Sequence, residues 1–149
     1  MTQIAALLRP RMVSSEVTTT KRETRMRKVA INRCFGGFGL SNEAFEKLLT
    51  RKGIDFVKVV EPEKSSLFGT TYFEAGHVGE DDHYLYEHQF CDKRKRDDPD
   101  LIAVIEEMGE TANGFAAEIH IMEIPSDVEW HIHEYDGLEH VAENHRTWS

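Results

Sequence analysis

A glycine-rich loop stands between a strand-like run and the start of an expected helix. The loop reads Gly36-Gly37-Phe38-Gly39, and Ser41 behind it is a good helix N-cap. Backbone N–H groups of such a loop, together with the positive end of a helix dipole, form a site for anions. The loop matches neither the Walker A pattern nor the dinucleotide fingerprint. Two interpretations remain open: an anion site, or a tight turn that needs positive φ.

Polar side chains near this loop suit a ligand with phosphate-like charge. An arginine side chain can bind two phosphate oxygens through parallel N–H groups. The predicted ligand-binding residues are Asn32, Arg33, Gly36, Gly37, Gly39, Ser41 and Arg96. The ligand that they predict is a small anionic molecule with nucleotide-like chemistry.

All eight histidines lie after residue 76, and several alternate along two strand-like runs near the C-terminus. If these runs, residues 117–124 and 128–135, pair as an antiparallel hairpin, His120 faces His131 across one side of the sheet. Imidazoles and a carboxylate in such a cluster are ligands that Zn²⁺ prefers. The predicted metal ligands are Glu118, His120, His131 and His133. The alternatives are a solvated polar face and a pH-sensitive interface.

Acidic residues gather near the C-terminus and in one loop. Glu134, Asp136, Glu139 and Glu143 predict an acidic surface, which is either solvated or faces a basic host protein. The run Glu80-Asp81-Asp82-His83 has the composition of a cation-binding loop but lacks the spacing of an EF-hand.

The composition limits the classes of partner. The 149 residues carry 18 basic and 27 acidic side chains, for a net charge of −9, which argues against binding of nucleic acid. Residues 1–28 have a net charge of +5, so the remaining residues carry −14. No apolar run approaches the roughly 18–20 residues of a membrane-spanning helix. Two cysteines are too few for a disulfide framework and suit a reducing compartment.

The hydrophobic pattern predicts the elements that position these residues. Strands are expected at 28–35, 54–60 (buried), 70–73, 83–90, 117–124 and 128–135, and helices at 41–53, 98–112 and 138–145. The predicted fold class is α+β: a mixed sheet of roughly four to six strands with two main helices and a short C-terminal helix. Trp148 is expected to dock on the body or on a partner.

The charge distribution also predicts the domain organisation. Residues 1–25 are expected to form a flexible basic arm, with an upstream start codon before Met26 as the alternative. Residues 26–149 are expected to form a single α+β domain with a variable insertion near 61–96. An unpaired sheet edge, and an arm opposite in charge to the body, predict a homo-oligomer.

From Met26 onward the chain resembles a family of small proteins that tailed phages and prophages encode. The segments that carry the resemblance are Ile31–Ser41, Arg96–Leu101, Glu123–Pro125, Asp127–Trp130, Glu134–Gly137 and His145–Trp148. The resemblance implies a phage accessory protein in the host bacterial cytoplasm, with no particular activity attached. Such genes often serve host takeover or counter-defence, which adds an expectation by analogy.

Three functions are consistent with these observations. The first is a non-enzymatic accessory protein that binds an anionic ligand at the glycine loop, or a host protein through its acidic face. The second is a metal-dependent hydrolase that uses Zn²⁺ or another divalent ion on the predicted hairpin. The third is a virion or assembly component.

Overall fold

The computed structural model describes residues 23–64 and 69–149, so the basic arm predicted at 1–25 lies almost wholly outside the described residues. The described residues form six strands and three α-helices, which confirms the α+β class. In chain order these are β1 (Met26–Asn32), α1 (Asn42–Arg51), β2 (Phe56–Val60), β3 (Thr70–Glu74), α2 (Glu87–Cys91), α3 (Pro99–Met108), β4 (Ile119–Pro125), β5 (Trp130–Tyr135) and β6 (Leu138–Glu143). Short 3₁₀ turns lie at η1 (Asp81–His83), η2 (Lys93–Lys95) and η3 (Gly109–Ala112).

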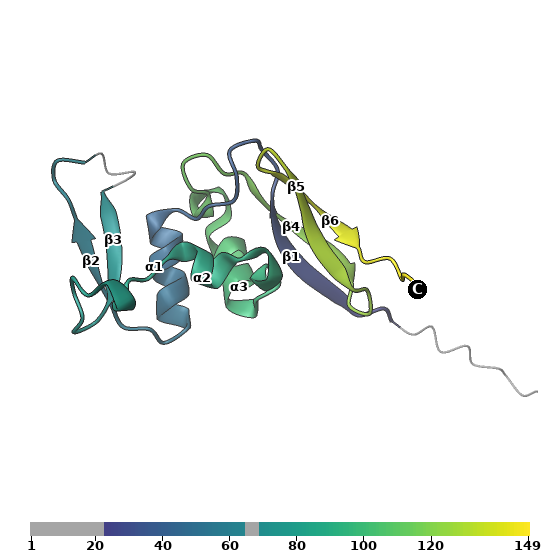
Figure 1. Ribbon diagram of the computed structural model, residues 1–149, viewed down its shortest axis with the longest axis horizontal. Helices are drawn as coiled ribbons and strands as arrows, with labels where there is room; N and C mark the ends of the chain where they lie inside the picture. Colours follow the sequence, from purple (N-terminus) through teal and green to yellow (C-terminus); the bar gives the residue numbers. More distant parts are fainter. Residues whose placement is uncertain (1–22, 65–68) are drawn as a thin grey trace, which may run out of the picture.

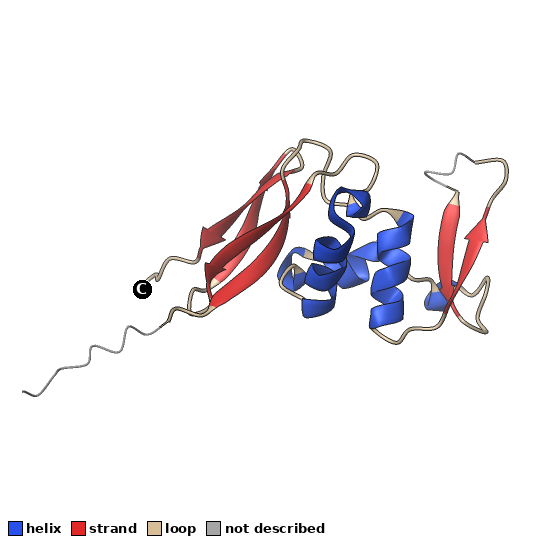
Figure 2. Ribbon diagram, turned by 180° about the vertical axis from the view of Figure 1, so that it is seen from behind, coloured by secondary structure: helices blue, strands red, loops and turns tan. Residues whose placement is uncertain are grey.

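The strands form three separate two-stranded sheets. β1 pairs with β4, β2 with β3, and β5 with β6, all antiparallel. Figures 1 and 2 show an elongated molecule with the β2–β3 ribbon at one end, the helices in the middle and the other four strands at the opposite end. The helices and the β5–β6 hairpin therefore lie on opposite sides of the β1–β4 pair.

Strand β1 is buried on both of its faces. Ala30 belongs to the larger core, which includes Leu48 of α1 and Val104 of α3. Val29 and Ile31 are 0% and 2% exposed and belong to a smaller core with Ile132 of β5. Successive strand residues point to opposite faces, so β1 connects the two cores. Complete burial of a Val or Ile side chain contributes about 1.5–3 kcal/mol, which makes β1 central to stability.

Both main helices begin at the residues that the sequence predicts. Ser41 Oγ accepts the backbone N–H of Ala44 at 3.2 Å, and Asp98 Oδ1 accepts the N–H of Leu101 at 3.1 Å. These bonds satisfy N–H groups that have no partner in the first turn of a helix. α3 ends earlier than predicted, at Met108, and the chain continues as η3 from Gly109, which has φ +60°.

The hairpin predicted between residues 117–124 and 128–135 is wrong. Both segments are strands, but β4 pairs with β1 over seven residues and β5 pairs with β6. The turn at Asp136 and Gly137, with φ of +50° and +84°, leaves Tyr135 and Leu138 opposite each other. Positive φ at both turn residues matches the twist of a tight hairpin, which makes β6 the local partner of β5.

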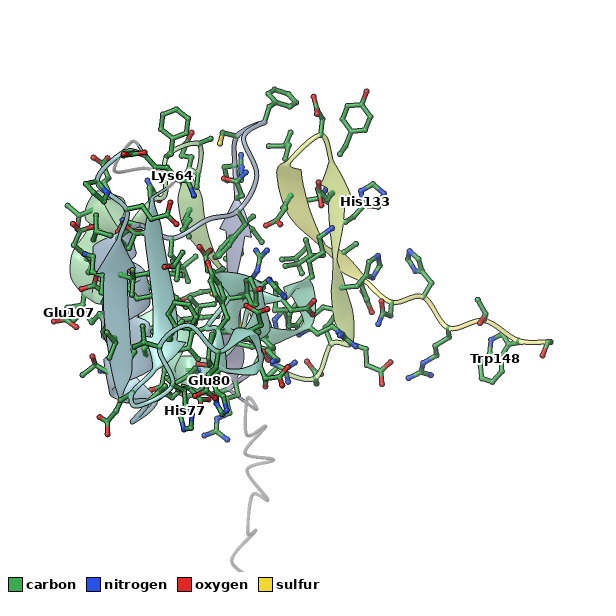
Figure 3. The ribbon with its side chains drawn as sticks, turned by 60° about the vertical axis from the view of Figure 1, so that its left-hand side comes forward. Lys64, His77, Glu80, Glu107, His133 and Trp148 are labelled. Carbon is green, nitrogen blue, oxygen red and sulfur yellow. The ribbon has the colours of Figure 1, made fainter. Side chains whose placement is uncertain are left out.

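Several other predictions need correction. Residues 138–143 form β6 and not the expected C-terminal helix, because the tight turn returns them alongside β5. Residues 83–90 form the end of η1 and most of α2, not a strand. β2 is not buried, since only β3 pairs with it and Val60 is 56% exposed. Trp148 is 88% exposed in the C-terminal tail and does not dock on the body (Figure 3).

The segment predicted as an insertion near 61–96 contributes directly to the core. Tyr72, Leu85 and Cys91 are each at most 6% exposed and pack in the larger cluster with α1 and α3. Phe45 of α1 contacts the Tyr72 ring edge-on at a centroid distance of 5.2 Å. The segment therefore supports the helices.

Candidate functional site

The glycine loop is closed by contacts within the protein. A Cβ added at Gly36 would lie 1.8 Å from the carbonyl oxygen of Ala116, and one at Gly137 would lie 2.6 Å from the backbone nitrogen of Gly37. Gly37 itself has φ +90°, which favours glycine. Close backbone approach at Gly36 and Gly137, together with positive φ at Gly37, explains these glycines without a ligand.

A carboxylate of the protein occupies the end of this loop. The backbone N–H of Leu40 donates to Glu87 Oε1 at 2.9 Å, and the Ser41 hydroxyl donates to the carbonyl of Thr111 at 2.7 Å. Burial raises the pKa of Glu87, while its bond to Leu40 and the nearby Arg96 act in the opposite direction. These donors are thus committed to internal partners.

Arg96 is buried and paired with Glu139, which the sequence placed on an acidic surface. The burial of Glu139 corrects that prediction at this position. Arg96 and Glu139 are each 4% exposed, and two hydrogen bonds join them, from Nη1 to Oε2 at 2.8 Å and from Nη2 to Oε1 at 3.0 Å. Arg96 Nε also donates to the carbonyl of Cys91 at 2.6 Å, and the guanidinium lies 3.5 Å from the Phe38 ring centroid. The side chain holds η2, β6 and the glycine loop together.

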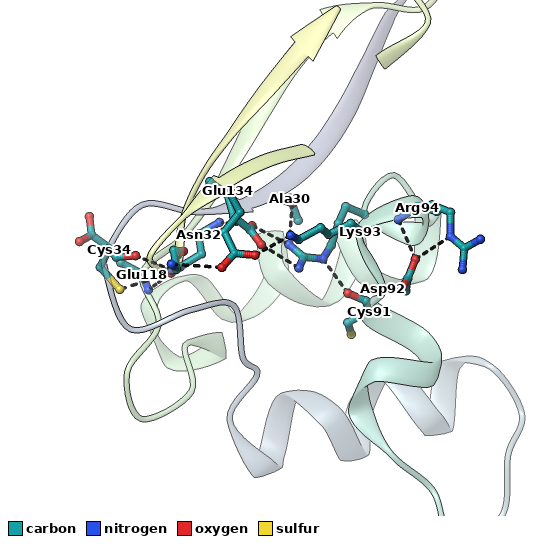
Figure 4. A network of polar contacts seen from close by, with 12 residues as sticks. Ala30, Asn32, Cys34, Cys91, Asp92, Lys93, Arg94, Glu118 and Glu134 are labelled. Atoms are coloured by element: carbon teal, nitrogen blue, oxygen red, sulfur yellow. Dashed lines mark hydrogen bonds and ion pairs between the residues drawn. The ribbon is translucent and has the colours of Figure 1, made fainter. Parts of the chain in front are cut away.

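Asn32 is fully buried and joins three segments. Its Nδ2 donates to the carbonyls of Cys34 and Gly137, both at 2.7 Å, and its Oδ1 accepts the N–H of Glu118 at 2.8 Å (Figure 4). Its own backbone N–H donates to Glu139 Oε2 at 2.9 Å. Of the predicted ligand residues, Asn32, Ser41 and Arg96 therefore have structural partners, whereas the Arg33 side chain is exposed.

The predicted metal ligands do not converge, because β4 and β5 are not partners. His120 Nε2 of β4 lies 2.9 Å from Oε1 of Glu118, the residue before this strand, while His131 of β5 contacts Asn144. The His133 ring lies 4.8 Å from the ring of His140 on β6. The hairpin that was predicted to bring these side chains together does not form in the described structure. The predicted zinc site is therefore not assembled there.

A pocket of about 500 Å³ lies between the start of β1, the η2 turn and the β4–β5 loop. Its walls are formed by basic, acidic, aromatic and small side chains. They are Arg27, Lys93, Arg94, Asp97, Ser126, Asp127, Val128, Glu129, Trp130, His131, Ile132 and Asn144. A second pocket of about 480 Å³ lies beside Phe38 and Arg96, but the Arg96 cation there is already bound to Glu139.

The basic residues of the first pocket have weak partners. Arg27 donates to the carbonyl of Ser126 at 3.2 Å and lies 3.8 Å from Asp97. The Arg94 side chain is 91% exposed beside Asp92, and Lys93 pairs with the exposed Glu134. Exposed ion pairs contribute only about 0–1 kcal/mol, so these cations can exchange their partners for a ligand at little cost.

Two basic residues of the pocket, Lys93 and Arg94, lie in the charged run of residues 92–97. This run is exposed at Lys93, Arg94 and Lys95 but buried at Arg96. Glu87 and Glu139 were missed as structural acids because nothing local distinguishes them from the other acidic residues. Only their tertiary contacts with Leu40 and Arg96 do so.

Within the part of the chain that the structure describes, no helix has the length and apolar character needed to cross a membrane. Comparison of the chain with protein-family models, with curated proteins and with solved structures found no significant match.

Proposed function

We propose that the protein binds a small nucleotide-like anion in the pocket between β1, η2 and the β4–β5 loop. The observation that carries the proposal is that Arg27, Lys93, Arg94 and Trp130 all line one pocket. Pockets for small molecules typically have volumes of about 300–1,000 Å³, and this one has about 500 Å³.

The mixture of groups in the pocket matches the parts of a nucleotide. Arginine and lysine bind phosphate oxygens, and an indole offers a face on which a base can stack for about 1–3 kcal/mol. Asp97, Asp127 and Glu129 line the same pocket. Their carboxylates can accept the amino hydrogens of a base edge, as Asp and Glu do with cytosine. A bare inorganic anion would meet repulsion from these three acids, so the pocket favours a ligand with both features.

The biological role that we propose is sequestration. A binding pocket with exposed cations, together with the resemblance to phage accessory proteins, favours a protein that removes a nucleotide signal during counter-defence in the host cytoplasm. This role needs affinity and no catalytic step.

Tryptophan fluorescence offers a direct test, because the chain has only two tryptophans. Trp148→Phe, at a residue that is 88% exposed, leaves Trp130 as the sole tryptophan reporter in the pocket. Titration of this variant with AMP and GMP is expected to give saturable quenching. Lys93→Ala and Arg94→Ala are each expected to weaken binding about 10- to 100-fold, since a hydrogen bond to a charged group contributes about 1.5–3 kcal/mol.

The matched control is Lys64→Ala, which removes one exposed cation from the loop that follows β2 (Figure 3), and β2 and β3 lie at the opposite end of the molecule from β1 and β5 (Figure 1). Its affinity is expected to equal that of the Trp148→Phe parent. The proposal is refuted if neither nucleotide changes Trp130 fluorescence, or if Lys93→Ala and Arg94→Ala bind as tightly as the parent. Equal affinity for inorganic phosphate and AMP would refute recognition of the base.

A further inference from the structure

The segment between β3 and η1 repeats every three residues. Glu74, His77, Glu80 and His83 follow one another at this spacing. The backbone N–H of His77 donates to the backbone carbonyl of Glu74 at 3.1 Å. In the same way the N–H of Glu80 donates to the carbonyl of His77 at 3.1 Å, and the N–H of His83 to the carbonyl of Glu80 at 3.0 Å. Each turn of this kind brings the Cα atoms of residues i and i+3 to within about 7 Å of each other. The spacing therefore gathers two imidazoles and two carboxylates.

Two glycines make this series of turns possible. Gly76 has φ +90° and Gly79 has φ +87°, and each occupies the third position of its turn. Type II turns require positive φ at this position. No heavy atom lies within 4 Å of a Cβ built at either glycine, so these glycines serve the backbone conformation and not a close contact.

The side chains of the segment meet at one edge of the molecule. His77 Nδ1 lies 3.2 Å from Glu80 Oε2, and His83 Nε2 lies 3.8 Å from the same oxygen. The two imidazole rings are stacked at 3.8 Å with an angle of 14° between their planes. Figure 3 shows His77 and Glu80 together at the surface. One ligand atom from each of the three residues lies within 4.8 Å of the other two.

A fourth side chain orients one of the imidazoles. Glu74 Oε2 lies 2.9 Å from His83 Nδ1, so it holds the ring and leaves Nε2 facing Glu80. Imidazoles that bind metals usually donate their other N–H to a carboxylate in this manner. Glu74 thus matches the outer carboxylate of a metal site.

We propose that His77, Glu80 and His83 form a binding site for a divalent transition metal, with Zn²⁺ as the best fit and Glu74 as the supporting carboxylate. Among the described residues, these three are the grouping whose ligand atoms lie close enough to share an ion. Two histidines and a glutamate are a known zinc ligand set, and three protein ligands leave the fourth position for water. The site shares no residue with the pocket lined by Trp130 and does not depend on the nucleotide proposal.

The geometry needs only small changes to accept the ion. Ligand atoms at about 2.0–2.1 Å from a tetrahedral Zn²⁺ lie roughly 3.3 Å apart, close to the 3.2 Å between His77 and Glu80. His77 and His83 must rotate out of their stacked arrangement so that both rings direct a nitrogen at the ion. The side chains of His77, Glu80 and His83 are 44%, 58% and 34% exposed, so these rotations meet little packing resistance.

Metal titration of the full chain after treatment with a chelator tests the proposal. Isothermal titration with Zn²⁺, and absorption of the Co²⁺ form in the visible range, are expected to show one equivalent with the spectrum of a tetrahedral site. His77→Ala and His83→Ala are each expected to lower the affinity more than 100-fold. Glu74→Gln is expected to lower it about 10- to 100-fold, the typical effect of losing an outer-shell partner.

Two further variants test whether the ion binds at these three residues and depends on the turn between them. Gly79→Ala keeps every ligand but strains the turn between His77 and Glu80, so affinity is expected to fall although all donors remain. His120→Ala removes an exposed histidine that also contacts a glutamate, and it is expected to leave the affinity unchanged. The proposal is overturned if the intact chain binds no stoichiometric Zn²⁺, or if His77→Ala and His83→Ala bind as tightly as the intact chain. A loss of the bound equivalent in His120→Ala would place the metal elsewhere and also overturn it.

Discussion

Glu139→Gln removes the negative charge that neutralises the buried Arg96 guanidinium. Each of the two residues is 4% exposed, and the pair is joined by hydrogen bonds of 2.8 and 3.0 Å. Glu139 Oε2 also accepts the backbone N–H of Asn32 at 2.9 Å. The amide of the variant retains an acceptor for Asn32 but leaves Arg96 charged and without its counter-ion.

The expected loss can be worked from these contacts. Removal of one partner of a buried ion pair costs about 3–5 kcal/mol, because the remaining charge is desolvated and uncompensated. Arg96 keeps the carbonyl of Cys91 at 2.6 Å and the face of Phe38 at 3.5 Å, and a cation over a ring gains about 0.5–2 kcal/mol. We therefore expect a loss near the lower limit, about 3 kcal/mol. Total stabilities of about 5–15 kcal/mol leave such a variant folded.

Urea-induced unfolding followed by circular dichroism measures this loss in a double-mutant cycle. Arg96→Met alone leaves Glu139 buried and unpaired, and is expected to cost about 3–5 kcal/mol. The double variant Arg96→Met/Glu139→Gln contains neither charge, so its loss is expected to be close to that of one single variant. The matched control is Glu107→Gln, which breaks the exposed pair with Lys47 at 2.6 Å and is expected to cost less than about 1 kcal/mol.

Two results would refute the reasoning. If Glu139→Gln costs no more than Glu107→Gln, the Arg96 charge does not depend on Glu139. If the losses of the two single variants add in the double variant, the residues do not interact, because coupled neighbours deviate from additivity by about 0.5–3 kcal/mol. Should a single variant fail to fold, recovery of folding in the double variant carries the same information.

Two further predictions concern the glycine loop and the cap of α3. Gly36→Ala places a Cβ 1.8 Å from the carbonyl oxygen of Ala116 and is expected to lower the free energy of unfolding by about 1–3 kcal/mol or more. Gly39→Ala in the same loop meets open space and is expected to change this free energy by less than about 1 kcal/mol. Equal losses of the two variants in urea unfolding would contradict the close approach at Gly36. Asp98→Ala is expected to cost about 1–2 kcal/mol at neutral pH. Burial acts to raise the pKa of Asp98, but the hydrogen bond from Lys52 and two backbone N–H groups hold the pKa below its usual value. The stabilisation is therefore present above about pH 4, the usual pKa of an aspartate, and is lost as the pH falls through the lowered pKa. The unfolding curves of the unaltered chain and of Asp98→Ala should therefore converge in acid. A difference in stability between these two proteins that stays constant into strong acid would contradict this role of Asp98.

The parts of the fold that could be predicted depend on neighbours in sequence. Ser41 and Asp98 start helices because their side chains bond N–H groups two or three residues ahead. The apolar spacing that follows each cap predicts a helix for the same local reason. The Asp136-Gly137 dipeptide is likewise a local turn signal, and in the structure it closes the hairpin between β5 and β6.

The wrong strand pairing was predicted where a strand has two possible partners, one adjacent in sequence and one distant. Residues 117–124 and 128–135 both alternate, and adjacency suggests that they pair with each other. In the folded protein β1 pairs with β4. In this arrangement Val29 and Ile31 pack with Ile132, and Ala30 packs in the cluster that contains the helices. Burial of a strand on both faces contributes more stabilising free energy than the short loop of a local hairpin does.

The candidate sites divide in the same way. Glu74, His77, Glu80 and His83, the residues of the proposed metal site, lie within ten consecutive residues. Their three-residue spacing, with glycines at 76 and 79, is visible in the sequence alone. The pocket around Trp130 joins residues 27, 93–97 and 126–132, which only the packing of β1, η2 and β5 brings together.

The sequence by itself determined the α+β class, the two helix caps and the tight turn, because each follows from bonds between residues close in the chain. The tertiary structure decided which strands pair, that Arg96 and Asn32 serve the core and not a ligand, and where the exposed cations gather. These outcomes depend on which distant group satisfies a buried donor or charge, and the free energy of that choice belongs to the whole packed chain.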